Sequence, residues 1–476
     1  MNELIQISIS LSIPICLGYC ILSYLFRRST LCSLTKLALS YGLGLGCLSI
    51  WMLILGILRL PLTTYSIGFP LLFISFVLAT LTYIYKKNHI NPNTQLHHND
   101  LFPYKFPLHV SFASIIKIIV LLLFLDFICL NLFYTFWYAF NMPIFAYDAI
   151  ATIAYKAKVI WTHQQLPDLN VFPHPSYPLF IPFIQAWIGF NLNYWSDQYI
   201  NIIFPICLTS YLMIHYRFLS EHTNKTWGLL GCVILLSSNL LTYHAGIAYR
   251  DLFLMYFNCV TIVLLIQWSN KKDSSYLILA SFFSGFTTFT KLEGTAYFLI
   301  HIVIFLFLNF KDNVFYLKKK WFNLAKFIFP SFIICFGYHL FKIMTLFAND
   351  TSIPLEKMEF EFSLEKLALF PTIIKVFLIN LFYSNNWNIF WFLFLIGLIH
   401  LTKKFRRLEI KILFLSLLSF FCLYIMVSLF TTNYIWIAGE KSATGLSRLF
   451  LHFFPLAVLL LVILIYPELE DTSDVF

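Results

Sequence analysis

Charged residues are scarce in this chain of 476 residues, where Asp, Glu, Lys and Arg make up 11% and hydrophobic types 60%. The mean hydropathy is +0.79. Soluble domains have about 25% charged and about 45–50% apolar residues, so the composition excludes a soluble enzyme, a disordered chain and a coiled coil. The 54 Phe and 27 Tyr lie in continuous runs, unlike the alternating strands of a membrane barrel. A membrane protein with many helical spans remains.

Disulfide and metal patterns are also missing. The ten cysteines show no CxxC spacing, and almost all lie inside apolar runs. We interpret them as thiols that pack as small hydrophobic groups.

The N-terminal apolar run has no basic region before it, since Arg27 and Arg28 come only after it. A cleaved signal peptide would need those cations in front. We therefore predict a retained first span with the N-terminus outside.

Apolar runs predict about thirteen spans. They cover residues 4–26, 34–57, 64–85, 112–138, 198–217, 226–243, 251–269, 274–290, 294–310, 322–346, 387–402, 409–430 and 446–466. The net charge of +10 comes from short Lys and Arg clusters between these runs. One orientation puts every cluster, and also the C-terminus, on the cytoplasmic side, as the positive-inside rule requires. The sequence thus predicts an all-α multi-pass protein, which we assign to a bacterial cytoplasmic membrane.

No internal repeat and no Gly/Ser linker divides the chain. We predict N-terminal spans and a cytoplasmic loop over residues 1–110, a main membrane domain over 111–466 and a cytoplasmic tail over 467–476. Segment 139–197 is too rich in proline and polar residues to cross lipid. It is expected to be external and to contain interfacial helices.

Residues 148–161, at the start of this segment, have the period of an amphipathic helix. One face is apolar and the other carries Asp148, Thr152, Tyr155 and Lys156. Asp148 and Lys156 are expected to point into a common external space. Asp148 has two interpretations, a helix N-cap or a catalytic carboxylate at the membrane surface.

Other charged and polar residues fall on the same predicted external side. They are His174 and Tyr177 in a proline-rich turn, Arg250 and Asp251 at the outer end of a span, Lys291 and Glu293 at an outer turn, and Lys441 and Arg448 before the last span. Each has an ordinary structural interpretation, as interface anchors, a hairpin tip or a snorkelling side chain. Carboxylates at a membrane boundary also favour a functional site.

The order of these motifs resembles the GT-C glycosyltransferases, a membrane superfamily that includes protein O-mannosyltransferases and bacterial aminoarabinose transferases. The resemblance covers roughly residues 115–466 and rests on FAYDAIATIAYKAKVIW, YPLFIPFIQAWIG, YRDLFLMYF, TKLEG and SRLFLHFFPLAVLL. It implies an extracytoplasmic active site and a polyprenyl-phosphate-linked sugar donor. Many members have two adjacent acids at the first external loop, whereas Ala149 follows Asp148 here.

Carried over residue by residue, the resemblance implies Asp148 and Asp251 as catalytic acids, and Lys291 and Arg448 as cations facing the lipid phosphate. We expect Lys156, His174, Tyr177, Arg250, Glu293 and Lys441 to help bind substrates. Since phosphate leaves readily and no ligand cluster is apparent, we expect no metal or other cofactor. The expected partners are a lipid-linked sugar, a glycan, lipid or protein acceptor and membrane lipids, and not nucleic acid.

The leading hypothesis is thus an inverting transferase with Asp148 as general base. A transporter or flippase of lipid-linked sugars is the second, and Asp126 and Lys342, charges within predicted spans, favour it. A polysaccharide polymerase or ligase is the third.

Overall fold

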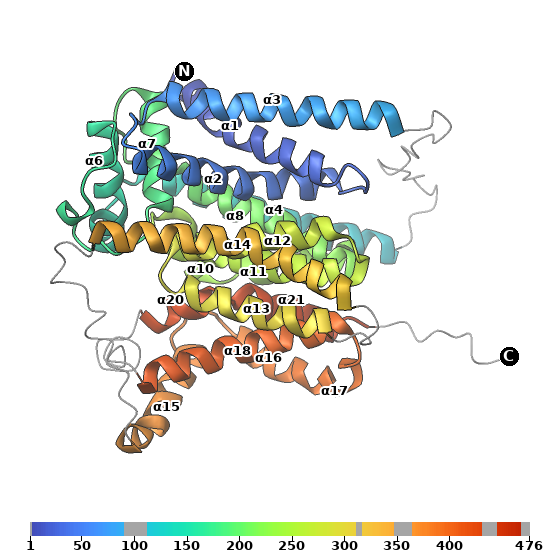
Figure 1. Cartoon of the computed structure of the whole chain (residues 1–476). Coiled ribbons are helices and arrows are strands. Elements are labelled where there is room, and N and C mark those ends of the chain that lie inside the picture. Colours follow the sequence, from blue (N-terminus) through green and yellow to red (C-terminus); the bar gives the residue numbers. More distant parts are fainter. Residues whose placement is uncertain (1, 90–111, 311–316, 347–363, 431–444, 468–476) are drawn as a thin grey trace.

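The computed structural model describes residues 2–89, 112–310, 317–346, 364–430 and 445–467. Within these ranges every regular element is a helix. Most of the long helices lie along roughly the same axis (Figure 1). The prediction of an all-α multi-pass membrane protein is confirmed.

Within the described ranges, eight helices are long and apolar enough to cross a membrane. The number of possible spans rises to ten if each of two bent helix pairs is counted as one span. The long helices are α1 (Asn2–Leu25), α2 (Ser33–Ile57), α3 (Thr64–His89), α4 (Phe112–Asn141), α8 (Ile203–His222), α11 (Arg250–Lys271), α14 (Leu317–Leu346) and α18 (Leu408–Phe430). The bent pairs are α9 (Lys225–Leu236) with α10 (Asn239–Gly246), at 76°, and α20 (Gly445–Leu451) with α21 (Phe454–Ile465), at 52°.

Three predicted spans correspond to helices below that length, so the count of thirteen is not confirmed. They are α12 (Ser274–Thr290), α13 (Gly294–Phe310) and the run α16 (Phe390–Gly397), η6 (Leu398–His400) and α17 (Leu401–Lys404). Shorter elements complete the fold: α5 (Tyr147–Ala149), η1 (Ile150–Ala154), α6 (Tyr155–His163), η2 (Leu169–Val171), α7 (Phe180–Leu192), η3 (Tyr199–Ile202), η5 (Leu364–Leu369) and α15 (Phe370–Phe382).

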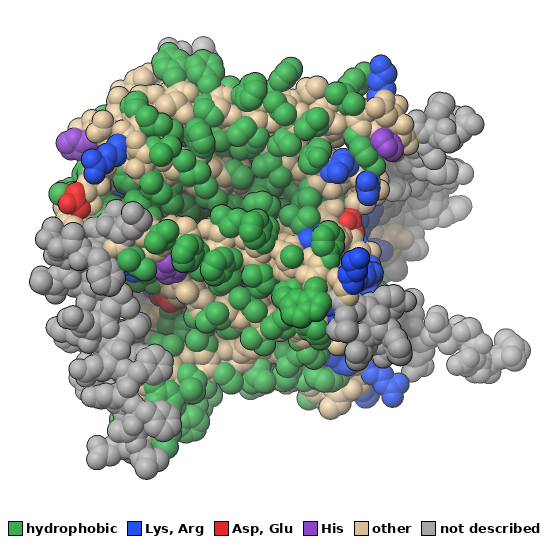
Figure 2. Space-filling view, viewed as in Figure 1, with side chains coloured by type: hydrophobic (Ala, Val, Ile, Leu, Met, Phe, Trp, Pro, Cys, Tyr) green, Lys and Arg blue, Asp and Glu red, His purple; other side chains and the backbone are tan. Residues whose placement is uncertain are grey.

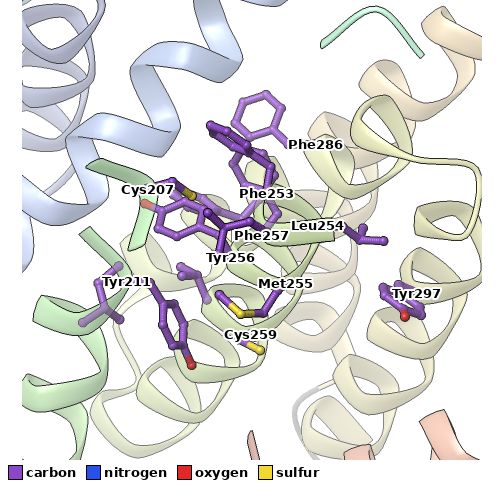
Figure 3. Packing of buried hydrophobic residues seen from close by; sticks show 14 of the residues in the cluster. Cys207, Tyr211, Phe253, Leu254, Met255, Tyr256, Phe257, Cys259, Phe286 and Tyr297 are labelled. Carbon is purple, nitrogen blue, oxygen red and sulfur yellow. The ribbon is translucent and has the colours of Figure 1, made fainter. Parts of the chain in front are cut away.

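Helix α11 is the centre of the core. The whole of its apolar window is buried, and α8, α12, α13 and α18 pack around it. Its aromatic side chains pack against those of neighbouring helices, and Phe257 meets Phe180 and Phe283 edge to face. Phe257 also packs against Phe286 of α12 (Figure 3). A helix covered on all sides holds the residues of its first turn, Arg250 and Asp251, in a fixed place at one end of the bundle.

The external segment contains two longer helical stretches, α5–η1–α6 and α7, and only the first of them has an exposed face. Helix α7 was expected to be interfacial, yet its residues from Phe180 to Phe190 are all buried. It is covered by α1, α2 and α6, and the Trp187 indole nitrogen donates to the Ser10 carbonyl at 2.7 Å. An apolar helix can be buried by neighbouring helices as well as by lipid, and its sequence does not distinguish the two.

Basic residues gather at the end of the bundle opposite the start of α11. Arg28 donates to the Tyr85 hydroxyl at 3.1 Å, which links the end of α1 to α3. Arg407 donates to the His222 carbonyl at 3.4 Å, which links the start of α18 to the end of α8. Lys and Arg side chains are prominent on the right-hand end in Figure 2, beyond a mostly hydrophobic middle. This arrangement agrees with the predicted charge asymmetry of a multi-pass membrane protein.

The contact between α1 and α2 is close enough to require glycine. A Cβ at Gly44 would lie 1.9 Å from the Pro14 carbonyl oxygen. Since backbone atoms cannot rotate aside, Gly44→Ala should lower the free energy of unfolding by roughly 1–3 kcal/mol. Gly337→Ala in α14 is the control, because a Cβ there meets nothing within 4 Å. Thermal unfolding in detergent measures both, and equal stability of the two variants would contradict the packing.

Candidate active site

Asp251 is a fully buried carboxylate at the first turn of α11. Its Oδ1 accepts from Lys291 Nζ and from His452 Nε2, both at 2.9 Å. Its Oδ2 accepts from Arg448, at 3.0 Å from Nη2 and 3.3 Å from Nε. A buried charge is tolerated only when it is paired and hydrogen-bonded, and here four donors from two other segments of the chain satisfy it.

Arg448 joins this buried acid to an exposed one. Its Nη1 lies 2.8 Å from Asp148 Oδ2, and its guanidinium stacks 4.5 Å from the centre of the Tyr249 ring. The side chain of Asp148 is 45% exposed, whereas that of Asp251 is 0% exposed. Two of the predicted acids therefore share one cation, and only Asp148 is open to a substrate.

Lys291 and Glu293 lie in the turn between α12 and α13. Lys291 Nζ is 3.0 Å from Glu293 Oε1. Burial acts to lower the pKa of Lys291, but the charges of Asp251 and Glu293 outweigh burial and raise it. The turn itself needs Gly294, since a Cβ there would lie 1.9 Å from the Thr287 carbonyl oxygen. We call Asp148, Asp251, Lys291, Glu293, Arg448 and His452 the ionic cluster.

His452 belongs to this cluster but was not predicted from the sequence. Its Nδ1 lies 2.7 Å from the Tyr297 hydroxyl and 3.1 Å from that of Tyr424. It follows Arg448 by four residues, which puts both side chains on one helical face, and Pro455 follows closely. That spacing before a proline was the available signal.

The break between α20 and α21 leaves the His452 carbonyl without a helical partner, because the Leu456 amide donates to Phe453 instead. Asn258 of α11 fills the gap by donating to that carbonyl at 2.8 Å. Its Oδ1 in turn lies 2.9 Å from His301 Nε2. A freed backbone group inside a membrane protein must find such a partner, and this one holds the broken helix against α11.

Asp148 lies in one continuous helical stretch formed by α5, η1 and α6, so the predicted helix over 148–161 is confirmed. The N-cap residue is Ala146, with no side-chain cap. The N-cap interpretation of Asp148 is therefore wrong. Its carboxylate bonds Arg448 instead of the backbone.

The common space expected for Asp148 and Lys156 does not form. Lys156 is fully buried, and its Nζ donates to the His174 carbonyl at 2.7 Å and to that of Tyr177 at 3.2 Å. The intervening turn η1 is a π-helix, which has more residues per turn than the α-helix behind the predicted faces. Burial, followed by the nearby Arg250 charge, lowers the pKa of Lys156 to about 6.

The remaining predicted residues lie around the cluster or outside the described chain. The Tyr177 ring lies beside Arg250, whose Cζ is 5.0 Å from its centre, and burial followed by the Glu293 charge raises the pKa of Tyr177. His174 is exposed, and its carbonyl serves Lys156. Arg250 is buried and bonds Thr152 and Pro178. Lys441 lies outside the described residues.

Asp126, which favoured a transporter, lies on the exposed face of α4. None of the apolar window of that helix is buried, and Leu122 and Leu130, one turn before and after Asp126, are 60% and 58% exposed. A transport pathway would need such a carboxylate inside the bundle. Lys342 is half-buried in α14.

The comparison with known families supports the predicted class of protein. The family model described as dolichyl-phosphate-mannose-protein mannosyltransferase matches residues 175–339. This match supports the interpretation of the chain as a GT-C membrane glycosyltransferase. The matched region is about a third of the chain and contains Arg250, Asp251, Lys291 and Glu293. No curated protein and no solved structure matches the chain.

Metal ligation was not expected from the sequence. Among the residues that the structure describes, no group of three or more His, Cys, Asp or Glu side chains could hold a metal ion. The ten cysteines are free thiols. Metal independence stays a prediction.

The two acids should differ in their effect on stability. Asp251→Asn leaves the buried cations Lys291 and Arg448 without their shared anion, so we expect a loss of about 3–5 kcal/mol. Asp148→Asn removes one partly exposed ion pair and should cost less than about 1 kcal/mol. Thermal or denaturant unfolding in detergent measures both, and equal losses would contradict the central role of Asp251.

Lys156 should make stability depend on pH. Its pKa is about 6 in the folded chain against an ordinary value of 10.5, so unfolding takes up a proton between these values. The contribution of Lys156 therefore grows as pH rises through this window, by at most about 1.4 kcal/mol per pH unit. The stability of the unmodified protein relative to Lys156→Met should increase from pH 7 to pH 9. Lys158→Met, at an exposed position of α6, is the control, and a flat difference for Lys156→Met would refute the prediction.

Proposed function

We propose that this enzyme transfers one sugar, with inversion, from a polyprenyl-phosphate donor to an extracytoplasmic acceptor. One observation carries the proposal: Arg448 contacts a buried and an exposed carboxylate at once. A candidate base and a candidate phosphate-binding cation therefore stand side by side. Their end of the bundle is opposite the basic clusters, and those clusters favour a cytoplasmic location.

Asp148 is the general base in this proposal. It takes the proton of the acceptor hydroxyl or amine as that group attacks the anomeric carbon. The bond from that carbon to the phosphate oxygen breaks, and its electron pair stays on the phosphate. Only Oδ2 of Asp148 bonds Arg448, which leaves Oδ1 to receive the proton.

Arg448 and Lys291 stabilise the leaving phosphate. Asp251 holds both side chains in fixed directions, and donors that need no reorganisation stabilise developing charge most effectively. Lys441 remains a proposed additional cation. Glu293 and Tyr177 lie beside this position, where hydroxyl groups of the sugar would accept and donate hydrogen bonds.

We further propose that the site faces the outer side of a bacterial cytoplasmic membrane, with the N-terminus outside and the C-terminus inside. The donor lipid stays in the bilayer, so the reacting carbon must be reached at the membrane surface. The separation of basic end and ionic cluster supports this orientation. No metal is part of the proposed reaction.

Asp148→Asn should reduce transfer to a slow residual rate while the protein still folds and binds donor. We expect a fall of about 10²–10⁴-fold in kcat, the usual contribution of a general base. Asp168→Asn is the matched control, because Asp168 is exposed in the same segment and caps η2, a role that Asn can also fill. The measurements are product formation with radiolabelled lipid donor and the mass of the spent lipid, expected to be a monophosphate. Full activity of Asp148→Asn would overturn the proposed base.

A further inference from the structure

We propose that Arg250 and Thr152 are positioning residues that hold Asp148 in place for catalysis, an inference that rests on the function proposed above. Arg250 was expected to bind substrate. Its contacts lead instead to the external helix that carries Asp148.

The first step of the link is the Thr152 hydroxyl. Its Oγ1 donates to the Asp148 carbonyl oxygen at 2.5 Å and accepts from Arg250 Nη1 at 2.5 Å. The hydroxyl proton and a lone pair are thus both used. Thr152 lies in the π-helical turn η1, which begins two residues after Asp148. Such turns are frequent at functional sites.

The second step is the Arg250 guanidinium. Its Nη2 bonds the Thr152 carbonyl oxygen and the Pro178 carbonyl oxygen, the latter at 3.3 Å, and its Cζ lies 5.0 Å from the Tyr177 ring centre. Arg250 and Thr152 are 4% and 5% exposed. One planar guanidinium therefore links two parts of the external segment, at Thr152 and Pro178, to the first residue of α11. Because the contacts are buried, little water competes with them.

Asp148 is consequently tied to α11 by two routes. Through its side chain it reaches Arg448, which is held by Asp251. Through its backbone it reaches Thr152, which is held by Arg250, the residue before Asp251. The two routes close a ring around the start of α11.

This arrangement separates two demands on Asp148. A donor phosphate that binds Arg448 competes with the Asp148 carboxylate for the same guanidinium. The backbone route does not involve Arg448, so Asp148 keeps its place while its carboxylate is released to act as base. The position of a catalytic group matters, since a displacement of about 1 Å from the productive geometry can lower the rate about 10²-fold.

The test compares three threonine variants. Thr152→Val removes the hydroxyl at constant size and should lower kcat by between about 10- and 100-fold, with the donor KM unchanged within about twofold. Thr152→Ser keeps the hydroxyl and should restore kcat. Thr162→Val is the matched control, because Thr162 makes the same bond to a carbonyl four residues earlier but is exposed, and it should retain full activity.

A double variant separates positioning from a general loss of structure. In Asp148→Asn, measured through its slow residual transfer, adding Thr152→Val should have no further effect, because the link acts only through Asp148. If Thr152→Val does not fold, Arg250→Lys provides the same readout, since an ammonium lacks the planar fork that spans these acceptors.

The outcomes distinguish this inference from the proposed function. If Asp148→Asn stays fully active, the proposed base itself is wrong. If Asp148→Asn is inactive while Thr152→Val is as active as Thr162→Val, only the positioning role is overturned. A raised donor KM at unchanged kcat would also overturn it, because that result would make Arg250 and Thr152 part of substrate binding.

Discussion

The site depends on a single buried charge. Asp251 lies at the head of a helix with no exposed apolar surface, so water cannot stabilise its carboxylate. Lys291, from the turn after α12, and Arg448, from the broken helix near the C-terminus, neutralise that charge. His452 of the same broken helix adds a hydrogen bond. The cost of an unpaired ion in a medium of low dielectric constant is what brings segments so distant in sequence to one point.

Asp251 and Asp148 differ in burial, and this difference suits them to different roles. Asp251 has every lone pair engaged and no exposed surface, which suits an electrostatic anchor. Asp148 shares only one oxygen with Arg448 and is open to the outside. The same cation serves both, so the orientation of the exposed acid depends on the buried one. Nothing in the amino-acid type separates these roles, and only the packing around α11 does.

The sequence predicted much of the fold, because its strongest signals are local. The bounds of α12 and α13 agree with the predicted spans 274–290 and 294–310, since charged turns interrupt continuous apolar runs there. The helix over 148–161 and the grouping of Asp148, Asp251, Lys291 and Arg448 at one end also followed from periodicity and charge bias.

Other features lie beyond local pattern. The direction of Lys156 depends on a π-helical turn, which has more residues per turn than the period of 3.6 used for the prediction. The direction of Arg250 depends on its contacts with Thr152 and Pro178, which are distant in the sequence. The role of His452 depends on a bend of 52° between two helices, and a proline signals a break without giving its direction. The burial of α7 depends on which helices surround it, and its apolar composition fits lipid equally well.

The burial of α7 bears on how the chain is assembled. Three helices that contact α7 precede it in the sequence, namely α1, α2 and α3. Gly68 of α3 lies beside the Trp187 ring. Since synthesis begins at the N-terminus, Ser10 and Gly68, which lie beside Trp187, are synthesised more than one hundred residues before the tryptophan itself. The helices that cover this short aromatic helix are therefore synthesised before the helix itself.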